Sequence, residues 1–574
     1  MTTETTIPGK DAALETTIAT LQARLAGRRF RLTESPPTHE VDGMWTTQLK
    51  DDDCPLLIAH GKGATELAAR ASAYGAFAER LGTHDFWSHY HLGATRANAP
   101  FVHYPSERWF APEADGAWPS GMLDPELHAL YNPAGDIDAG VLVDLNSGNV
   151  ARGICALPYQ RLRDGATAYI PVNLIGNLYA GNGIASGNTV NEARVHALSE
   201  IFEHAVKYRV VAEGLCLPEV PDDVIARFPN LEAGIAGLRA AGFGVLVKDA
   251  SLGGKYPVMN VTLIHPTDQG VFTSYGAHPR LKIALERALT GLPRGLSLDA
   301  LEGCPEPSFD PADIDAVANL EAHFPDAGGV IAWDFLSDTS DYPFVDWNFS
   351  ATTGEDYQWL VDALHAEGKD IYVADFDEQG VYTCRIVVPG FSEIYPVEDL
   401  GWENNSVGNA LRPLLARLQE LSVQECTALL VELQTSSLDD ERALWEILGL
   451  AVPAGTPWQQ LRIGELKTLL ALVVGDEEAV LEGCNWIHHY GDLPKPRRLV
   501  YRCIDSIVRL EEPDNFRRAL ELLYGAATLA TAEALLDGSE RFFGLETLGP
   551  NFEGSLMHQS LLAAYDKLFA PDAV

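Results

Sequence analysis

Residues 183–209 read GIASGNTVNEARVHALSEIFEHAVKYR, in which a turn of small and polar residues leads directly into an apolar-periodic segment. Glu192 follows Thr189 by three residues, which is the spacing of a capping box, so we expect a helix to begin here. Three carboxylates and a single lysine share one side of this helix. Such a side repels itself unless water or a cation intervenes.

The polar residues of this helix fall within an arc of roughly 100° when each residue turns the helix by about 100°. They are Glu192, His196, Ser199, Glu200, Glu203 and Lys207. The arc is either a solvated acidic face with a capping glutamate or a site for a divalent cation, and magnesium held partly by phosphates would suit it. A rise of ~1.5 Å per residue places Glu192 and Glu203 ~16 Å apart, so they cannot share one ion, whereas Glu200 and Glu203 can.

Composition limits the class of protein and of partner. The 574 residues suffice for roughly three or four average domains, or for one large domain with an appendage. The chain has 41 Lys and Arg against 81 Asp and Glu, and this formal charge of −40 opposes docking on nucleic acid or anionic lipid. We therefore expect neither a nucleic-acid partner nor a membrane surface.

Three features indicate a cytoplasmic protein. The opening MTTETTIPGKDAALETT has neither the basic segment nor the apolar core of a signal peptide. The apolar run Leu469 to Val474 is far shorter than the ~20 residues of a membrane helix. The eight cysteines show no C-x-x-C spacing, which favours a reducing compartment over a disulfide framework.

The chain changes character once along its length. Up to about residue 400 it mixes short strands with helices and lacks clean βαβ alternation, which predicts an α+β domain. One expected helix, Thr65 to Leu81, carries Ser72, Ala76 and Glu79 on one face. After about Asn405 one helical pattern follows another, as in helical-repeat arrays. We therefore place the first domain at 1–410 and the second at 411–574.

The usual phosphate-binding loops are absent from the sequence. None of the four Gly-Lys pairs is followed by Ser or Thr, and GNGIASG at 181–187 has one residue too many for the dinucleotide pattern. A nucleotide would bind elsewhere, and the helix N-terminus at Asn188-Thr189 offers free N–H groups. Arg280 and Arg287 share a helix face and form either a phosphate clamp or surface salt bridges.

Several motifs together make the chain resemble the YcaO family. The most specific motif is S-G-N-T-x-x-E-A-x-x-x-x-L-S-E-x-x-E, which lies within 176–203. The others are IPGKDAALE at 7–15, HGKGATELAARASAYGAFAERL at 60–81, DYPFVDWNFS at 341–350, RIVVPGFSEIYPVEDL at 385–400 and LRIGELK at 461–467. The resemblance covers nearly the whole chain.

The resemblance implies a YcaO-type α+β nucleotide-binding domain, followed by an all-helical, tetratricopeptide-like domain that contributes to a homodimer. It implies ATP and Mg²⁺ as cofactors. The residues fit this implication, because clustered glutamates with magnesium and arginine are the parts that phosphoryl transfer requires. The activity it implies is activation of a peptide amide, or assistance to a radical methylthiotransferase in the β-methylthiolation of a small-subunit ribosomal protein.

The family's functional positions carry over residue by residue. Those implied to bind ATP are Lys10, Thr17, Ser72, Asn188, Glu192, Glu203, His204 and Arg287. Those implied to bind the metal are Glu79, Glu192, Glu200 and Glu203.

Two positions depart from the family pattern. Ala76 stands where the S-x-x-x-E-x-x-E-R helix has its first glutamate, and His204 stands where E-x-x-E-R ends in arginine. The first change should weaken magnesium binding, and the second should weaken phosphate neutralisation. An alternative is therefore a nucleotide-binding scaffold without turnover that recruits a modifying enzyme. The final FAPDAV replaces the Pro-x-Pro-x-Pro end of azoline-forming members, which argues against heterocycle synthesis.

Overall fold

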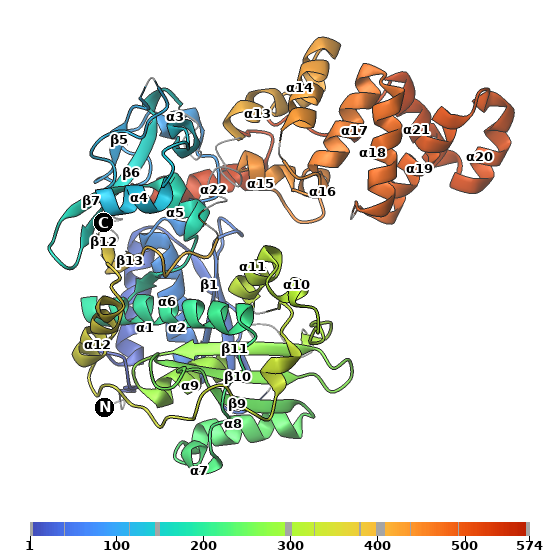
Figure 1. The fold of residues 1–574 in the computed structure, drawn as a ribbon. Coiled ribbons are helices and arrows are strands. Elements are labelled where there is room, and N and C mark those ends of the chain that lie inside the picture. The colour runs from blue at the N-terminus through green and yellow to red at the C-terminus, as the bar shows by residue number, and fades with distance from the viewer. Residues whose placement is uncertain are drawn as a thin grey trace.

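A computed structural model describes residues 4–39, 41–113, 115–143, 150–292, 301–326, 328–377, 380–395, 397, 408–436, 438–491 and 493–569. Within these ranges the named strands form three sheets, and every pairing between them is antiparallel. From α13 (Gly408–Leu415) onward the named elements are all helical (Figure 1). The predicted α+β class with an all-helical C-terminal part is therefore confirmed.

The first sheet supports the helix that was predicted over Thr65 to Leu81. This helix, α2 (Glu66–Gly82), begins where the Thr65 hydroxyl accepts the Ala68 N–H at 3.1 Å, and it packs across β4. Only glycine fits at Gly61 in β4, because a Cβ there would lie 2.1 Å from the Ala69 carbonyl oxygen. On this sheet β3 pairs with the other strands, which are β1 (Leu32–Glu34), β2 (Thr38–His39), β3 (Trp45–Asp51) and β4 (Ile58–Gly63).

The second sheet has the order β11-β10-β9 and lies below α6 in Figure 1. Helices α8 (Pro229–Ala240) and α9 (Leu281–Thr290) pack on it. Contacts with both α6 (Val190–Ala212) and α9 leave β11 buried along its whole length. The strands are β9 (Gly244–Asp249), β10 (Val258–Ile264) and β11 (Val271–Ala277).

The third sheet leads into the helix that was predicted to begin at Thr189. Its order is β5-β6-β12-β13-β8, with β7 also paired to β6. From β8 the chain turns tightly at Gly187, where a Cβ would lie 2.5 Å from the Ala193 nitrogen, and enters α6. Thr189 is the N-cap and accepts the Glu192 N–H at 3.2 Å, so the predicted start is confirmed. The strands are β5 (Arg108–Phe110), β6 (Ile154–Arg161), β7 (Thr167–Pro171), β8 (Ile184–Ser186), β12 (Tyr372–Phe376) and β13 (Thr383–Val387).

Helix α6 lies in the interior of the first domain, where it contacts β8, β11, β13 and α12 (Thr353–Ala366). Its apolar residues join one buried cluster with side chains of these elements. Its polar side is covered in part, since Glu192 is 3% exposed, Ser199 0% and Lys207 5%, whereas the Glu200 side chain is 30% exposed. The interpretation as a solvated face does not hold for Glu192, and for Glu200 and Glu203 both interpretations stay predictions.

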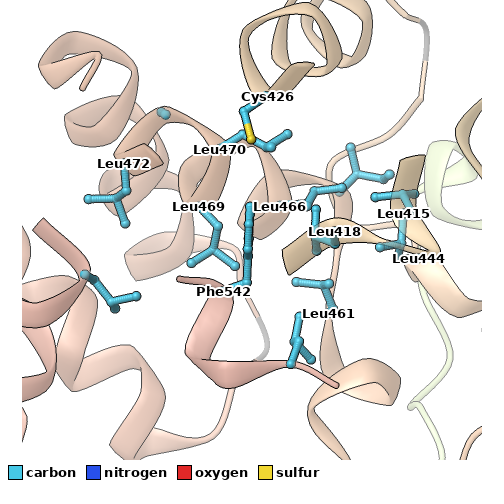
Figure 2. Packing of buried hydrophobic residues seen from close by; sticks show 14 of the residues in the cluster. Leu415, Leu418, Cys426, Leu444, Leu461, Leu466, Leu469, Leu470, Leu472 and Phe542 are labelled. Atoms are coloured by element: carbon cyan, nitrogen blue, oxygen red, sulfur yellow. The ribbon is translucent and has the colours of Figure 1, made fainter. Parts of the chain in front are cut away.

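The C-terminal helices extend to one side of the body (Figure 1) and share a leucine-rich core (Figure 2). Successive helices contact each other in the series α14, α17, α18, α19 and α21. Leu466, Leu469 and Leu470 of α17 are almost completely buried in this core. The helices are α13, α14 (Val423–Thr435), α15 (Leu444–Leu448), α16 (Pro457–Gln460), α17 (Ile463–Val474), α18 (Glu477–His489), α19 (Lys495–Arg509), α20 (Arg517–Tyr524) and α21 (Ala526–Asp537).

The last helix, α22 (Leu556–Lys567), returns to the N-terminal body (Figure 1). Its apolar residues join the core formed by α1 (Leu14–Gly27) and α2. The Trp87 indole N–H donates to the Leu561 carbonyl at 3.0 Å, and Lys567 Nζ lies 2.8 Å from Asp53 Oδ2. The helical region is thus tied to the body through α22, and a division at 410/411 stays a prediction.

Three features noted in the sequence lie partly outside the described residues: the end of the 385–400 motif, the change of pattern near Asn405 and the last residues of FAPDAV. Among the helices that are described, none combines the length and the apolar character needed to span a membrane.

Candidate functional site

Glu192 is the centre of a hydrogen-bond network at the N-terminal end of α6. Its carboxylate accepts from Lys10 Nζ at 3.1 Å, from the Asp11 backbone N–H at 2.9 Å and from Asn188 Nδ2 at 3.0 and 3.1 Å. Only the Thr189 half of the expected capping box forms, because the Glu192 carboxylate is directed to these donors. The buried charge of Glu192 is therefore compensated within the protein.

The N-terminal segment completes this network. Thr17, on α1, donates to Asn188 Oδ1 at 3.0 Å. Asp11 accepts hydrogen bonds from the hydroxyls of Thr189 and Thr353, the latter at 2.8 Å. The structure thus joins Lys10, Thr17, Asn188 and Glu192, four of the residues singled out in the sequence. Asp11 was missed, and its only signal was its place beside Lys10 in the IPGKDAALE motif.

A second group of carboxylates, Glu79, Glu200 and Glu203, is formed by α2 and by the following turns of α6. Burial raises the pKa of Glu79 well above its usual value, and the charge of Glu200 raises it further. Burial also raises the pKa of Glu200 to about 8, and Glu203 adds to this effect. These carboxylates therefore lie close enough to repel one another, as the sequence led us to expect for Glu200 and Glu203.

Positive charges lie beside this second group. Arg287, on α9, and Lys62, on β4, both act to lower the pKa of Glu200. The Arg287 guanidinium donates to the Ala277 carbonyl at 3.1 Å, which ties it to the end of β11. Lys62 was missed in the sequence, because the pair Gly61-Lys62 does not fit a Walker loop. The carboxylates on the polar side of α6 are thus influenced by charges of both signs.

Of the two arginines considered as a clamp, only Arg287 acts on the carboxylates of α6. Arg280 is the N-cap residue of α9, and its guanidinium pairs with the fully buried Asp356, with Nε 3.1 Å from Oδ1. The clamp interpretation is therefore wrong for Arg280, which forms a salt bridge instead.

The remaining residues singled out in the sequence surround the second group. Ser72 lies half-buried on α2, about two turns before Glu79. His204 Nε2 lies 3.9 Å from Glu200 Oε1, and its ring packs against Phe324. Ala76 packs against the core between α1 and α2. The roles of these residues toward a nucleotide stay predictions.

The donor set of the second group fits Mg²⁺ better than a transition metal. Its members are carboxylates, the hard oxygen ligands that Mg²⁺ prefers. In the described part of the chain, no group of three or more His, Cys, Asp and Glu could hold a metal ion. In nucleotide sites Mg²⁺ is usually bound through one or two carboxylates together with the phosphates, and the roles of Glu79, Glu200 and Glu203 toward such a complex stay predictions.

A polar cleft of about 410 Å³ opens beside Lys10. Its lining includes Asn191 from the first turn of α6, Arg280 before α9, and Thr352 and Thr353 at the start of α12. The network around Glu192 therefore has open space next to it that can admit a polar ligand.

Two family models match most of the chain. The YcaO cyclodehydratase model, described as ATP- and Mg²⁺-binding, matches residues 60–392, and the YcaO cyclodehydratase C-terminal model matches 408–571. The "Ribosomal protein S12 methylthiotransferase accessory factor YcaO" of Escherichia coli (strain K12) is 44% identical over 575 residues, which are 99% of this chain and 98% of that protein. An uncharacterized protein of Haemophilus influenzae is 42% identical over 578 residues, again 99% and 98%.

Solved structures are more distant. YcaO from Methanopyrus kandleri bound with AMPPCP and Mg²⁺ has a TM-score of 0.40 and 17% identity, over 67% of this chain and 92% of that chain. A heterocyclase in complex with substrate and cofactor has a TM-score of 0.43 and 18% identity, over 67% of this chain and 53% of that chain. The family assignment rests on the family models and on the sequence relatives.

Proposed function

The chain belongs to the YcaO family and has ATP and Mg²⁺ as its cofactors, and from this premise we propose that it uses them in the modification of a peptide or of a ribosomal protein. Its role is to activate a peptide amide or to assist the β-methylthiolation of a small-subunit ribosomal protein beside a radical methylthiotransferase. The name of the Escherichia coli relative supports the second form.

One observation carries this proposal: the charge of Glu200 raises the pKa of Glu79, the charge of Glu203 raises the pKa of Glu200, and Arg287 lies close enough to lower the pKa of Glu200. When bound, ATP supplies the phosphoryl group that turns an amide oxygen into a leaving group, and Mg²⁺ neutralises its phosphates. One or two of Glu79, Glu200 and Glu203 would hold the metal together with the phosphates. Arg287 and Lys62 would neutralise phosphate oxygens, because they are the two cations from elements other than α6 that act on Glu200.

Glu192 has a different task in this proposal. It holds Lys10 and Asn188 by hydrogen bonds of 3.0 to 3.1 Å, so the ammonium and the amide are oriented before the nucleotide arrives. Such preorganisation avoids the entropic cost of ordering these groups during binding. Glu192 therefore acts as a positioning residue, and Lys10 and Asn188 contact the nucleotide.

A second candidate function is a scaffold that binds ATP without turnover and recruits a modifying enzyme through its C-terminal helices. Two observations favour it: Ala76 removes a carboxylate from α2, and His204 lies near Glu200 where the family has arginine. We further propose that the chain forms a homodimer and acts in the cytoplasm, and light scattering of the purified chain tests the dimer.

Calorimetry with Mg-ATP, followed by a phosphate-release assay, separates these functions. We expect binding in both cases. Release stimulated by the ribosomal protein together with the methylthiotransferase identifies an ATP-using factor, whereas binding without release under that condition identifies the scaffold. Failure to bind Mg-ATP would overturn both.

A further inference from the structure

A small cavity lies at the C-terminal end of α2, away from the carboxylates of α6. Its volume is about 70 Å³. Thr83, the residue that ends α2, lines it, as do residues of β6, of α5 (Val172–Leu178) and Tyr565 of α22. Most of its wall is apolar, and the apolar side chains are Trp87, Leu92, Val102, Leu157, Val172, Ile175 and Phe376.

Three buried polar atoms belong to residues that line this cavity. They are His84 Nε2, Tyr104 Oη and Tyr159 Oη, on residues that are 7%, 3% and 0% exposed. Within the residues that the structure describes, none of the three atoms has a hydrogen-bond partner. A buried polar atom without a partner costs about 1–3 kcal/mol, so three around one cavity indicate a ligand that supplies the partners.

The tautomer of His84 follows from its other nitrogen. His84 Nδ1 contacts the carbonyl oxygen of His103, which can only accept, so Nδ1 carries the hydrogen. Burial lowers the pKa of His84 to about 4. His84 Nε2 is therefore an acceptor, whereas the hydroxyls of Tyr104 and Tyr159 can donate.

Arg385, on β13, brings a positive charge to the same wall. The residue is 6% exposed, and its Nη1 donates to the Ala180 carbonyl. Its Nη2 lies 3.8 Å from Asp85, but Asp85 also pairs with Arg80 Nε at 3.0 Å. Two guanidinium groups thus share one carboxylate, which leaves a positive charge at this wall that a bound anion can neutralise.

We propose that this cavity binds a small aliphatic monocarboxylic acid together with one proton. One carboxyl oxygen accepts from Tyr104, Tyr159 and Arg385, and the other shares the proton with His84 Nε2. The tail lies against the apolar wall. At 10–15 Å³ for each water-sized position, 70 Å³ holds about five to seven positions, which is enough for the non-hydrogen atoms of propionate.

The charged and titratable groups around His84 come from several elements. They are Asp85 beside it in the chain, His103 and Tyr104 before β5, Tyr159 on β6, Arg385 on β13 and Tyr565 on α22. The Arg385 guanidinium is already fully protonated and the two tyrosines are neutral donors, so His84 Nε2 is the group that receives the proton.

Calorimetry of the full chain with sodium propionate at pH 7 tests the proposal. Titrations in phosphate and in Tris, whose ionisation enthalpies differ, should report one site and the uptake of about one proton. Tyr104→Phe and Tyr159→Phe each remove only a hydroxyl, and we expect each to weaken propionate binding about tenfold. Propionamide, which brings no negative charge to Arg385, should bind about tenfold more weakly than propionate.

Tyr275→Phe is the matched control, because the Tyr275 hydroxyl is also buried without a partner in the described residues but does not line the cavity. It should leave propionate binding unchanged. Val172→Phe should fill the cavity and abolish binding while circular dichroism shows a folded chain. The proposal is overturned by an absence of heat up to about 100 mM propionate, by equal affinity for propionamide, by equal loss in Tyr275→Phe, or by unchanged binding in a folded Val172→Phe variant.

Discussion

The two ends of the polar side of α6 carry the same carboxylate chemistry in opposite surroundings. At the first end, Glu192 accepts from Lys10, from the Asp11 backbone and from Asn188. At the other end, Glu200 lies beside Glu79 and Glu203, and burial and the charge of Glu203 raise its pKa to about 8.

The carboxylate at the Glu192 end has its hydrogen-bond donors within the protein, whereas the carboxylates at the Glu200 end need a ligand. A buried carboxylate with several donors is stable as an ion, whereas crowded carboxylates favour a bound cation or a proton. The first end is therefore a preformed support for the nucleotide site. The second end is complete only when Mg²⁺ and phosphate oxygens are present.

The largest effect is expected when the hydrogen bonds of Glu192 are removed. Glu192→Ala leaves Lys10, Asn188 and the Asp11 N–H without their acceptor, and we expect the first turn of α6 to open more easily by ~3–4 kcal/mol. Hydrogen exchange of the amides of residues 190–196 measures this opening free energy. Glu200→Ala is the matched variant, and it should leave these amides unchanged. Equal loss of protection in the two variants would contradict the comparison.

The next largest effect is expected when the Glu200 carboxylate is removed. If the chain turns over ATP, Glu200→Gln should lower Mg-dependent phosphate release about 100-fold, or ~2.7 kcal/mol, because it removes a magnesium ligand. The magnesium concentration for half-maximal release should rise, and excess magnesium should restore part of the activity. In Glu192→Gln the loss should not respond to magnesium. A loss in Glu200→Gln that magnesium leaves untouched would place Glu200 away from the metal.

The starts of two helices could be predicted from the sequence, because each start depends on a side chain next to it in the chain. The starts of α2 and α6 follow from Thr65 and Thr189, whose hydroxyls cap their helices. The periodicity of α6 gave its polar side correctly. Periodicity does not say which groups from other elements act on a side, and here Lys62 of β4 and Arg287 of α9 act on Glu200, and Glu200 acts on Glu79 of α2.

Contacts between residues far apart in the chain could not be predicted from the spacing of residues in the sequence. Lys10 and Glu192 are 182 residues apart in the chain, and only the family resemblance placed them together. Arg280 and Arg287 looked equivalent on one helix face, but Asp356, on α12, engages Arg280. The cavity beside His84 has no sequence signal, because its wall combines loop, strand and helix residues from distant segments.

A smaller effect is expected when a carboxylate is added near the Glu200 end of α6. Ala76→Glu restores the carboxylate that the family pattern has on α2, and we expect it to strengthen Mg-dependent ATP binding about tenfold, or ~1.4 kcal/mol. Ala76→Gln has nearly the same size without the charge and should not strengthen binding. Calorimetry with and without magnesium compares the two variants. An unchanged dissociation constant in Ala76→Glu would mean that position 76 does not face the metal.

The smallest effect concerns the cation that is missing beside Glu200. His204→Arg replaces an imidazole 3.9 Å from Glu200 by a permanent positive charge. The guanidinium can pair either with Glu200 or with a phosphate, and this competition limits the gain in Mg-ATP affinity to about threefold, or ~0.7 kcal/mol. The gain should disappear in 0.5 M salt, because this part of the site is only partly buried. His204→Gln, which is neutral, should show no gain. If His204→Arg instead weakens Mg-ATP binding, the arginine pairs with Glu200 and removes a ligand from the metal, so the second end needs its carboxylates unpaired.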